Sequence, residues 1–181
     1  MLTQSDLPSG YQYESGSPRA SASAVAKYPS VTGSVDKCVL NPSVTFTGGR
    51  PRAETLQFAG TADAGGSESV STFPSARAAK SYFTRFERAF ARLPDCTAVR
   101  IDHDSSSATP AEQLGTYDAL DVGKVGDERM GVVLDPAAPD PNARAAVFRD
   151  GNVVVLVQIA DPAMSDAEFR TLLERADKRA A

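Results

Sequence analysis

PSARAAKSYFTRFERAFARLPDC, residues 74–96, predicts an amphipathic helix near the middle of the chain. Ser75 is a typical N-cap, and Pro94 has no backbone N–H with which to continue a helix, so we expect the helix to span 76–93. Apolar residues recur within it at spacings of three and four, which places them on one face that packs against a core. They are Ala79, Tyr82, Phe83, Phe86, Phe90 and Leu93.

A second helix is predicted at the end of the chain. Residues 165–168, with the sequence SDAE, form a capping box, in which Ser165 and Glu168 satisfy backbone N–H groups of the first helical turn. An apolar stripe follows, made of Phe169, Leu172, Leu173 and Ala176. We therefore expect a helix over 166–179 that also packs on the core.

Several short segments alternate apolar and polar residues, as half-buried strands do. The expected strands are residues 55–59, 67–73, 97–103, 117–122, 129–134, 144–148 and 152–159, with a short one at 11–13. The dipeptide Asp150-Gly151 between the last two predicts a tight hairpin. Residues 153–157 are apolar on both faces, which predicts a central strand covered on both sides.

The N-terminal part, residues 1–50, is expected to be rich in loops. Residues 15–34 are rich in Ser, Ala, Gly and Pro, and turn-forming residues follow Cys38 as far as Gly48-Gly49. No internal repeat or domain boundary is evident, so we expect one domain over 1–181. The order of elements predicts an α+β fold, in which two amphipathic helices, 76–93 and 166–179, pack on a mostly antiparallel twisted sheet.

Length, composition and charge exclude several classes of protein. The chain has 181 residues, of which 41% are hydrophobic and 23% charged, values typical of a globular domain rather than a disordered chain. The net charge of −4 argues against non-specific nucleic-acid binding, which requires a strongly basic surface. We expect no transmembrane segment, because no apolar run approaches the roughly 18 residues needed to span a bilayer.

The two cysteines, Cys38 and Cys96, admit two interpretations: one disulfide or two buried, inert thiols. A metal site needs three or four ligands, whereas this chain offers two distant cysteines and one histidine. A reactive thiol would need a nearby histidine or a basic helix start, and neither is evident. We favour the disulfide, which would stabilise the fold by about 4 kcal/mol in the chain-entropy model and would persist in an oxidising compartment.

No motif predicts catalysis, a metal or a cofactor. His103 lies between Asp102 and Asp104, which would suit a pH switch, but its position at a strand end beside three serines favours an ordinary solvated side chain. The chain has no Gly-x-Ser-x-Gly elbow and no phosphate-binding glycine loop. The oxygen-rich loop with Asp135, Asp140 and Asn142 is interrupted by prolines and lacks calcium-site spacing. We therefore expect no enzyme activity.

The polar face of helix 76–93 is strongly basic. It carries Arg77, Lys80, Arg85, Arg88 and Arg92, with Glu87 alongside. The four arginines could contact an anionic partner or membrane surface. The alternative is an ordinary solvated helix face, partly neutralised by acidic neighbours in the fold.

The chain resembles a family of exported actinobacterial sensor domains. Residues 2–11, LTQSDLPSGY, look like the start of the mature part of many actinobacterial lipoproteins. Residues 70–79, VSTFPSARAA, lead into a helix that ends near Cys96, and this arrangement resembles the extracytoplasmic sensor domain of the mycobacterial kinase PknH and its lipoprotein relatives. The PsbP-like lipoprotein fold is a second comparison. The chain departs from the sensor family in lacking a second cysteine pair and a tryptophan before the later cysteine.

The resemblance implies an exported, lipid-anchored domain with a cleft for an unidentified ligand, and it transfers no catalytic residues. We interpret Met1 as an added start in place of a removed export signal. The function expected is a non-enzymatic ligand-binding or sensor-type lipoprotein domain, secreted or anchored to the outer face of the cell membrane. Its partner would be a small molecule or an envelope protein. The alternative is a protein-interaction module at the cell envelope without a small-molecule pocket.

Overall fold

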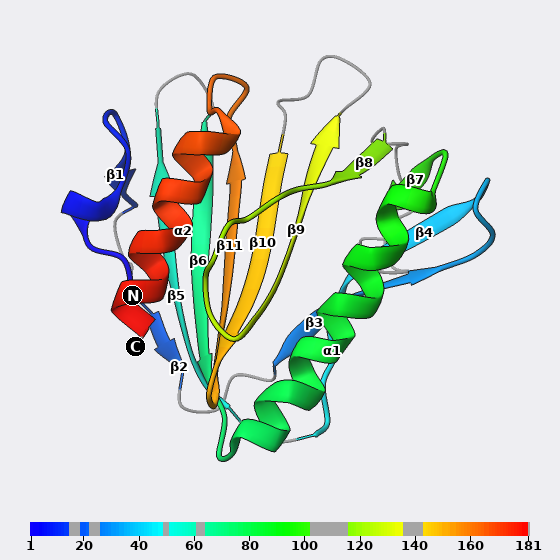
Figure 1. The fold of residues 1–181 in the computed structure, drawn as a ribbon, viewed down its shortest axis with the longest axis horizontal. Helices are drawn as coiled ribbons and strands as arrows, with labels where there is room; N and C mark the ends of the chain where they lie inside the picture. Colours follow the sequence, from blue (N-terminus) through cyan, green and yellow to red (C-terminus); the bar gives the residue numbers. More distant parts are fainter. Residues whose placement is uncertain are drawn as a thin grey trace.

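The computed structural model describes residues 1–14, 19–21, 26–48, 51–60, 64–101, 116–135 and 143–180, and it has an α+β architecture (Figure 1). The helices are α1 (Ala76–Arg92) and α2 (Asp166–Ala180), with single 3-10 turns η1 (Gln4–Asp6) and η2 (Leu93–Asp95). The strands are β1 (Gln12–Tyr13), β2 (Arg19–Ser21), β3 (Lys27–Thr32), β4 (Cys38–Thr45), β5 (Arg52–Ala59), β6 (Gly65–Thr72), β7 (Val99–Ile101), β8 (Thr116–Ala119), β9 (Glu128–Asp135), β10 (Ala143–Asp150) and β11 (Val153–Ala160).

The larger of two sheets contains eight strands and is antiparallel throughout. Its order is β1-β5-β6-β11-β10-β9-β8, and β2 also pairs with β5. The hairpin predicted at Asp150-Gly151 is confirmed, because β10 and β11 pair in register and Gly151 adopts the left-handed conformation that such a turn requires, with φ 52°. Strand β11 lies in the middle of this sheet, as its apolar sequence predicts.

A second, three-stranded sheet has the order β3-β4-β7, in which β4 and β7 are parallel. The prediction of loop or turn structure at 15–34 and from Cys38 to Gly48 is therefore wrong for Arg19–Ser21, which forms β2 of the larger sheet, and for Lys27–Thr32 and Cys38–Thr45, which form β3 and β4 of the smaller one. Both β3 and β4 contain a proline, Pro29 or Pro42, and proline is more typical of turns than of strands. Pro29 lies on edge strand β3, where the register with β4 shifts between Tyr28 and Ser30. Proline, which has no N–H to donate, is tolerated at such positions.

The two helices cover opposite faces of the larger sheet. Alternate residues of β11 point to opposite faces of the sheet. Val155 packs with Phe169 and Leu172 in the apolar cluster around α2, the α2 cluster. Val154 packs with Phe83 in the apolar cluster around α1, the α1 cluster. The smaller sheet shares the α1 side, and Figure 1 shows α1 lying beside β3 and β4. The larger sheet therefore divides the core into two layers, an α1 face and an α2 face.

Both helix starts have the predicted caps. The Ser75 hydroxyl accepts the backbone N–H of Ala78 at 3.2 Å. The capping box before α2 is complete, because Glu168 accepts the Ser165 backbone N–H at 2.9 Å and Ser165 accepts that of Glu168 at 3.2 Å. At its C-terminal end α1 tightens into η2 at Leu93 rather than continuing as an α-helix.

Candidate ligand-binding cleft

A cleft of about 570 Å³ opens between α1 with the smaller sheet and the α1 face of the larger sheet. Pockets of this volume hold small organic ligands. One wall comes from α1, β3 and β4, and the floor comes from five neighbouring strands, β5, β6, β11, β10 and β9, with β8 at one end. Residues as far apart in the sequence as Lys27 and Ala160 therefore line the same cleft.

The wall and one half of the floor are apolar. Phe86 and Phe90 lie on the apolar face of α1, which packs toward the sheet, and Leu93 follows in η2. The floor beneath them contains Leu134, Ala145 and Leu156, and all three remain partly exposed although they pack against the α1 cluster. The two neighbouring lining residues Tyr117 and Val132 are buried, and burial raises the pKa of Tyr117 to about 12, so its phenol is neutral at physiological pH.

The other half of the floor is polar. Gln57 on β5 is paired in register with Ser67 on β6, and Ser67 is paired with Gln158 on β11, so the three side chains form one row across adjacent strands. We call these three residues the polar row. Both glutamines are exposed. In the next row of the same face Thr55 and Ser69 share a hydrogen bond of 3.1 Å.

Among the described residues, the lining contains two cations, Lys27 and Arg144, and neither belongs to the polar row. Arg144 belongs to the same side of β10 as Ala146 and Phe148, which pack in the α2 cluster, and its guanidinium pairs with Asp166 of α2 at 2.9 Å. It therefore contributes backbone rather than charge to the cleft. Lys27 is exposed on edge strand β3, on the wall opposite the floor.

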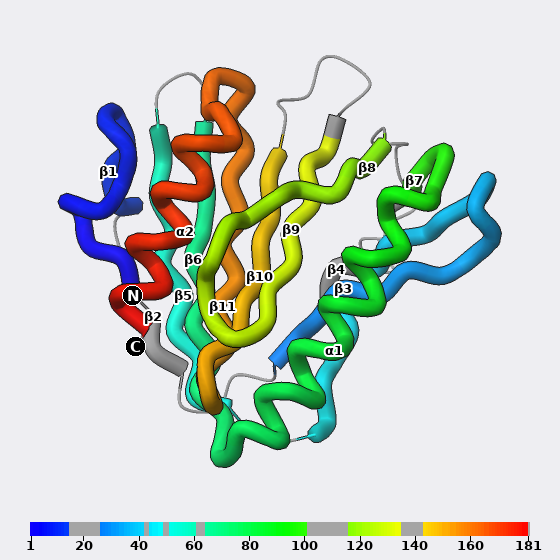
Figure 2. The backbone as a smooth tube through the Cα atoms, viewed as in Figure 1, coloured from blue at the N-terminus to red at the C-terminus, as the bar shows by residue number. Residues whose placement is uncertain are grey.

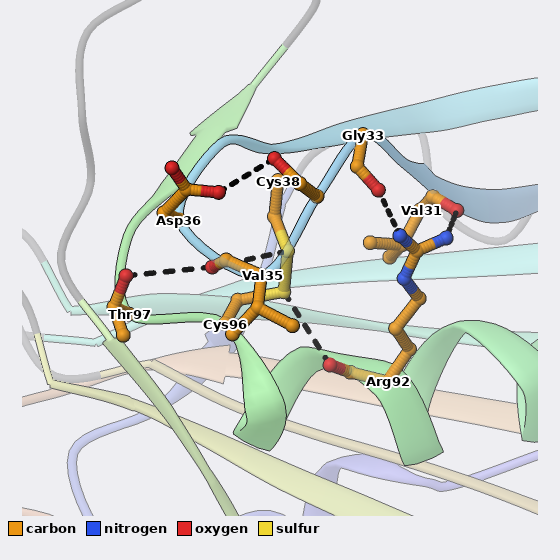
Figure 3. Close-up of a disulfide and its surroundings, with 9 residues drawn as sticks. Val31, Gly33, Val35, Asp36, Cys38, Arg92, Cys96 and Thr97 are labelled. Carbon is orange, nitrogen blue, oxygen red and sulfur yellow. Dashed lines mark hydrogen bonds between the residues drawn. A yellow bond between two sulfur atoms is a disulfide. The ribbon is translucent and has the colours of Figure 1, made fainter.

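Cys38 and Cys96 form a disulfide that ties two parts of the cleft wall together (Figure 3). Cys38 begins β4, which carries the lining residue Leu40, and Cys96 follows the turn that carries the lining residue Leu93. Both cysteines are buried, with Cα atoms 5.9 Å apart. The predicted bridge is thus present, and it fixes the end of α1 against the smaller sheet.

The basic face of α1 is partly used inside the fold. Arg92 donates to the backbone carbonyl oxygens of Val31, at 3.0 Å, and Gly33 (Figure 3). The Arg85 guanidinium lies over the ring of Tyr28, 5.6 Å from its centroid. Lys80 pairs with Glu128.

The other two predicted contact residues, Arg77 and Arg88, are exposed. A role for this face toward an anionic surface stays a prediction.

Other sites considered from the sequence add little chemistry. His103, Asp140 and Asn142 lie outside the described residues, as does the side chain of Asp135. Within the described residues no group of three or more His, Cys, Asp or Glu side chains is placed to hold a metal ion. Over that same part of the chain, neither helix combines the length and apolar character that crossing a membrane would need.

The polar row is the part of the site that sequence reasoning missed. A faint signal exists: β6 places Ser67, Ser69 and Ser71 at alternate positions, where a half-buried strand would ordinarily have apolar residues on one face. Gln57 and Gln158 likewise occur among apolar neighbours. The register that joins all three could not be seen, because β11 is far from β5 and β6 in sequence.

Comparison with solved structures finds proteins of similar fold. It is similar to that of the extracellular domain of PknH from Mycobacterium tuberculosis. The two share 14% sequence identity with a TM-score of 0.58, over 95% of this chain and 85% of that one. The resemblance inferred from sequence is thereby confirmed at the level of fold.

A second solved structure supports the same placement. An uncharacterised protein of Mycobacterium smegmatis, an Rv0999 ortholog, matches 97% of this chain and 91% of its own length at 10% identity, with a TM-score of 0.50. No protein-family model and no curated protein sequence matches the chain.

Proposed function

We propose that this chain is a non-enzymatic, extracytoplasmic ligand-binding domain of the sensor type, and that its ligand occupies the cleft between α1 and the larger sheet. The observation that carries the proposal is the cleft itself, which combines a partly exposed apolar floor with a row of hydrogen-bonding side chains. Concave, mainly apolar sites with a few convergent polar groups are the usual form of small-molecule sites.

The extracytoplasmic location is supported by two independent features. The disulfide between Cys38 and Cys96 suits an oxidising compartment, because thiols in the cytosol are kept reduced. The solved structure of similar fold is an extracellular domain. A lipid anchor on the N-terminal side of the domain is part of the same proposal and follows from the resemblance of residues 2–11 to mature lipoproteins.

A protein-interaction module is the competing function, and it has less support. Docking surfaces usually present a contiguous apolar patch. Among the described residues the one large hydrophobic side chain that is exposed is Val35, at 53%. The floor of the cleft, by contrast, has partly exposed apolar side chains, Leu134, Ala145 and Leu156.

Native mass spectrometry of freshly purified protein tests the proposal. We expect a co-purified small molecule that is absent from the variant Ala145→Phe, because Ala145 lies on the floor and a phenyl ring there would fill the cleft. Ala167→Phe, at an exposed position of α2, is the matched control and should retain the ligand. A ligand-free wild type, or equal retention by both variants, would contradict the proposal.

A further inference from the structure

The chemistry of the cleft narrows the class of ligand. We propose that the occupant is an uncharged, single-chain amphiphile, whose alkyl or acyl chain lies beneath α1 and whose hydroxyl- or amide-bearing head lies on the polar row. This inference rests on the proposed function, which it makes more specific. It follows from the division of one cleft floor into an apolar half and a polar half.

The apolar half requires an apolar occupant. Leu134, Ala145 and Leu156 are partly exposed on the floor, and Phe86 and Phe90 stand opposite on α1. Water in contact with such a concave apolar surface is unfavourable, and removing that contact is the main gain from ligand binding. A wholly polar ligand would leave this gain unused, so part of the occupant must be hydrocarbon.

The polar row specifies an uncharged head. The Gln57 and Gln158 amides each carry donors and an acceptor, and the Ser67 hydroxyl is both. Hydroxyl and amide groups match this set, because they also donate and accept. A carboxylate or phosphate only accepts hydrogen bonds, and it would be moved from water to a floor whose described residues direct no cation into the cleft, since Arg144 pairs with Asp166 on the opposite face.

The dimensions favour one chain rather than two. Neighbouring strands lie about 4.8 Å apart, so the floor from β5 to β9 spans four intervals, or about 19 Å. The polar row crosses β5, β6 and β11, and the apolar half crosses β11, β10 and β9. Each half is therefore about 10 Å wide, measured across the strands. A volume of about 570 Å³ accommodates one chain of medium length with its head group.

Calorimetric titration with matched twelve-carbon probes tests the assignment. We expect 1-monolauroylglycerol, below its aggregation concentration, to bind at least about tenfold more tightly than laurate, which has the same chain and an anionic head. Dodecyltrimethylammonium, with a cationic head, should also bind more weakly. Gln158→Leu should weaken binding of the monoacylglycerol about tenfold, because a site hydrogen bond is lost and the ligand hydroxyl is left unpaired. Gln12→Leu, which removes an exposed glutamine on β1, should bind like the wild type.

The outcomes separate this inference from the proposed function. Laurate binding as tightly as the monoacylglycerol would overturn the uncharged head and implicate Lys27 instead. Unchanged affinity in Gln158→Leu would overturn the role of the polar row. If none of the three probes binds, the amphiphile assignment fails, whereas the proposed function is decided separately by whether Ala145→Phe loses a co-purified molecule.

Discussion

Glu68 is fully buried on the α2 face of the larger sheet, although a carboxylate normally requires water or a cationic partner. One oxygen accepts the backbone N–H of Leu2 at 2.7 Å, and the other has no hydrogen-bond partner in the described part of the chain. Burial raises the pKa of Glu68 from its ordinary value of 4.5, and nearby Asp6 adds to the rise, while the Leu2 N–H and the N-terminal amine oppose it. Folding therefore shifts this carboxyl toward its protonated form, compared with the unfolded chain.

Replacing Glu68 by Gln should remove a pH dependence of stability. Because the pKa is higher in the folded than in the unfolded chain, the folded state binds more protons between the two pKa values, and the free energy of unfolding falls as the pH rises through that interval. The contribution of Glu68 to stability is thus greatest below about pH 4.5 and declines at higher pH. Glu68→Gln should flatten the decline and stabilise the protein at pH 8. Urea unfolding at several pH values measures the free energy of unfolding and its slope with pH.

Glu54→Gln is the control for that experiment. Glu54 lies on the neighbouring strand β5, is only partly buried and pairs with Arg52 at 3.2 Å. Its replacement removes a partly exposed ion pair rather than a buried carboxyl, so it should not stabilise the protein at pH 8. An equal slope in wild type and Glu68→Gln would show that the carboxyl is ionised at no cost in the folded protein.

At the scale of elements, side chains of α1 satisfy the backbone of edge strand β3. The Tyr82 hydroxyl donates to the carbonyl oxygen of Lys27, and Arg92 donates to those of Val31 and Gly33. An exposed strand edge is open to pairing with another chain, and covering it avoids this. The arginine that the sequence places on a solvated helix face thus joins α1 to the smaller sheet.

Arg92→Gln should destabilise the protein by about 1–2 kcal/mol, because hydrogen bonds from a charged donor contribute more than neutral ones. The loss should appear as a lower urea midpoint at constant m-value. Arg88→Gln, which changes an exposed arginine one turn earlier, should have little effect. Equal midpoints for the two variants would show that the contacts of Arg92 with β3 contribute no stability.

The sequence predicts those elements whose signal is local. Helices α1 and α2 and the β10–β11 hairpin depend on spacings of two, three or four residues and on short caps and turns, and all are confirmed. Strands β3 and β4 were missed because their stability comes from α1, the disulfide and a shifted register around prolines, none of which is visible within the segment itself. The polar row was missed for the same reason, since it depends on pairing between residues 57, 67 and 158.

At the scale of the whole molecule, the larger sheet separates two cores that differ in completeness. On the α2 face Leu56 and Phe58 of β5 are buried together with α2 and with Leu2 and Leu7 of the N-terminal segment. Figure 2 shows both chain ends on this side, where Arg179 pairs with Asp6 at 3.0 Å. On the α1 face β5 and β6 instead present Thr55, Gln57 and serines, and the cleft opens over them. The closed core supports the fold, and the incomplete core leaves the cleft in which we propose that the ligand binds.

The basic face of α1 gives a test of how the molecule would lie against a membrane. The apolar face of α1 is buried, so α1 cannot insert, and only electrostatic docking is available through exposed residues such as Arg77 and Arg88. Each basic residue near an anionic surface contributes on the order of 1 kcal/mol, within a Debye length of about 8 Å at physiological salt. The net charge of −4 opposes this docking unless the acidic residues lie on the far side of the molecule.

We expect the protein to bind vesicles containing phosphatidylglycerol at low salt, and Arg77→Glu/Arg88→Glu to bind at least about tenfold more weakly in a sedimentation assay. These two positions are chosen because Arg85 and Arg92 contact β3 and the residue after it, so that changing them would alter the fold as well as the charge. Lys124→Glu/Lys178→Glu makes the same change in net charge at exposed positions off α1 and should bind nearly as the wild type does. Equal losses in the two double variants would mean that net charge alone governs binding, and no binding at low salt would leave this face as solvated surface.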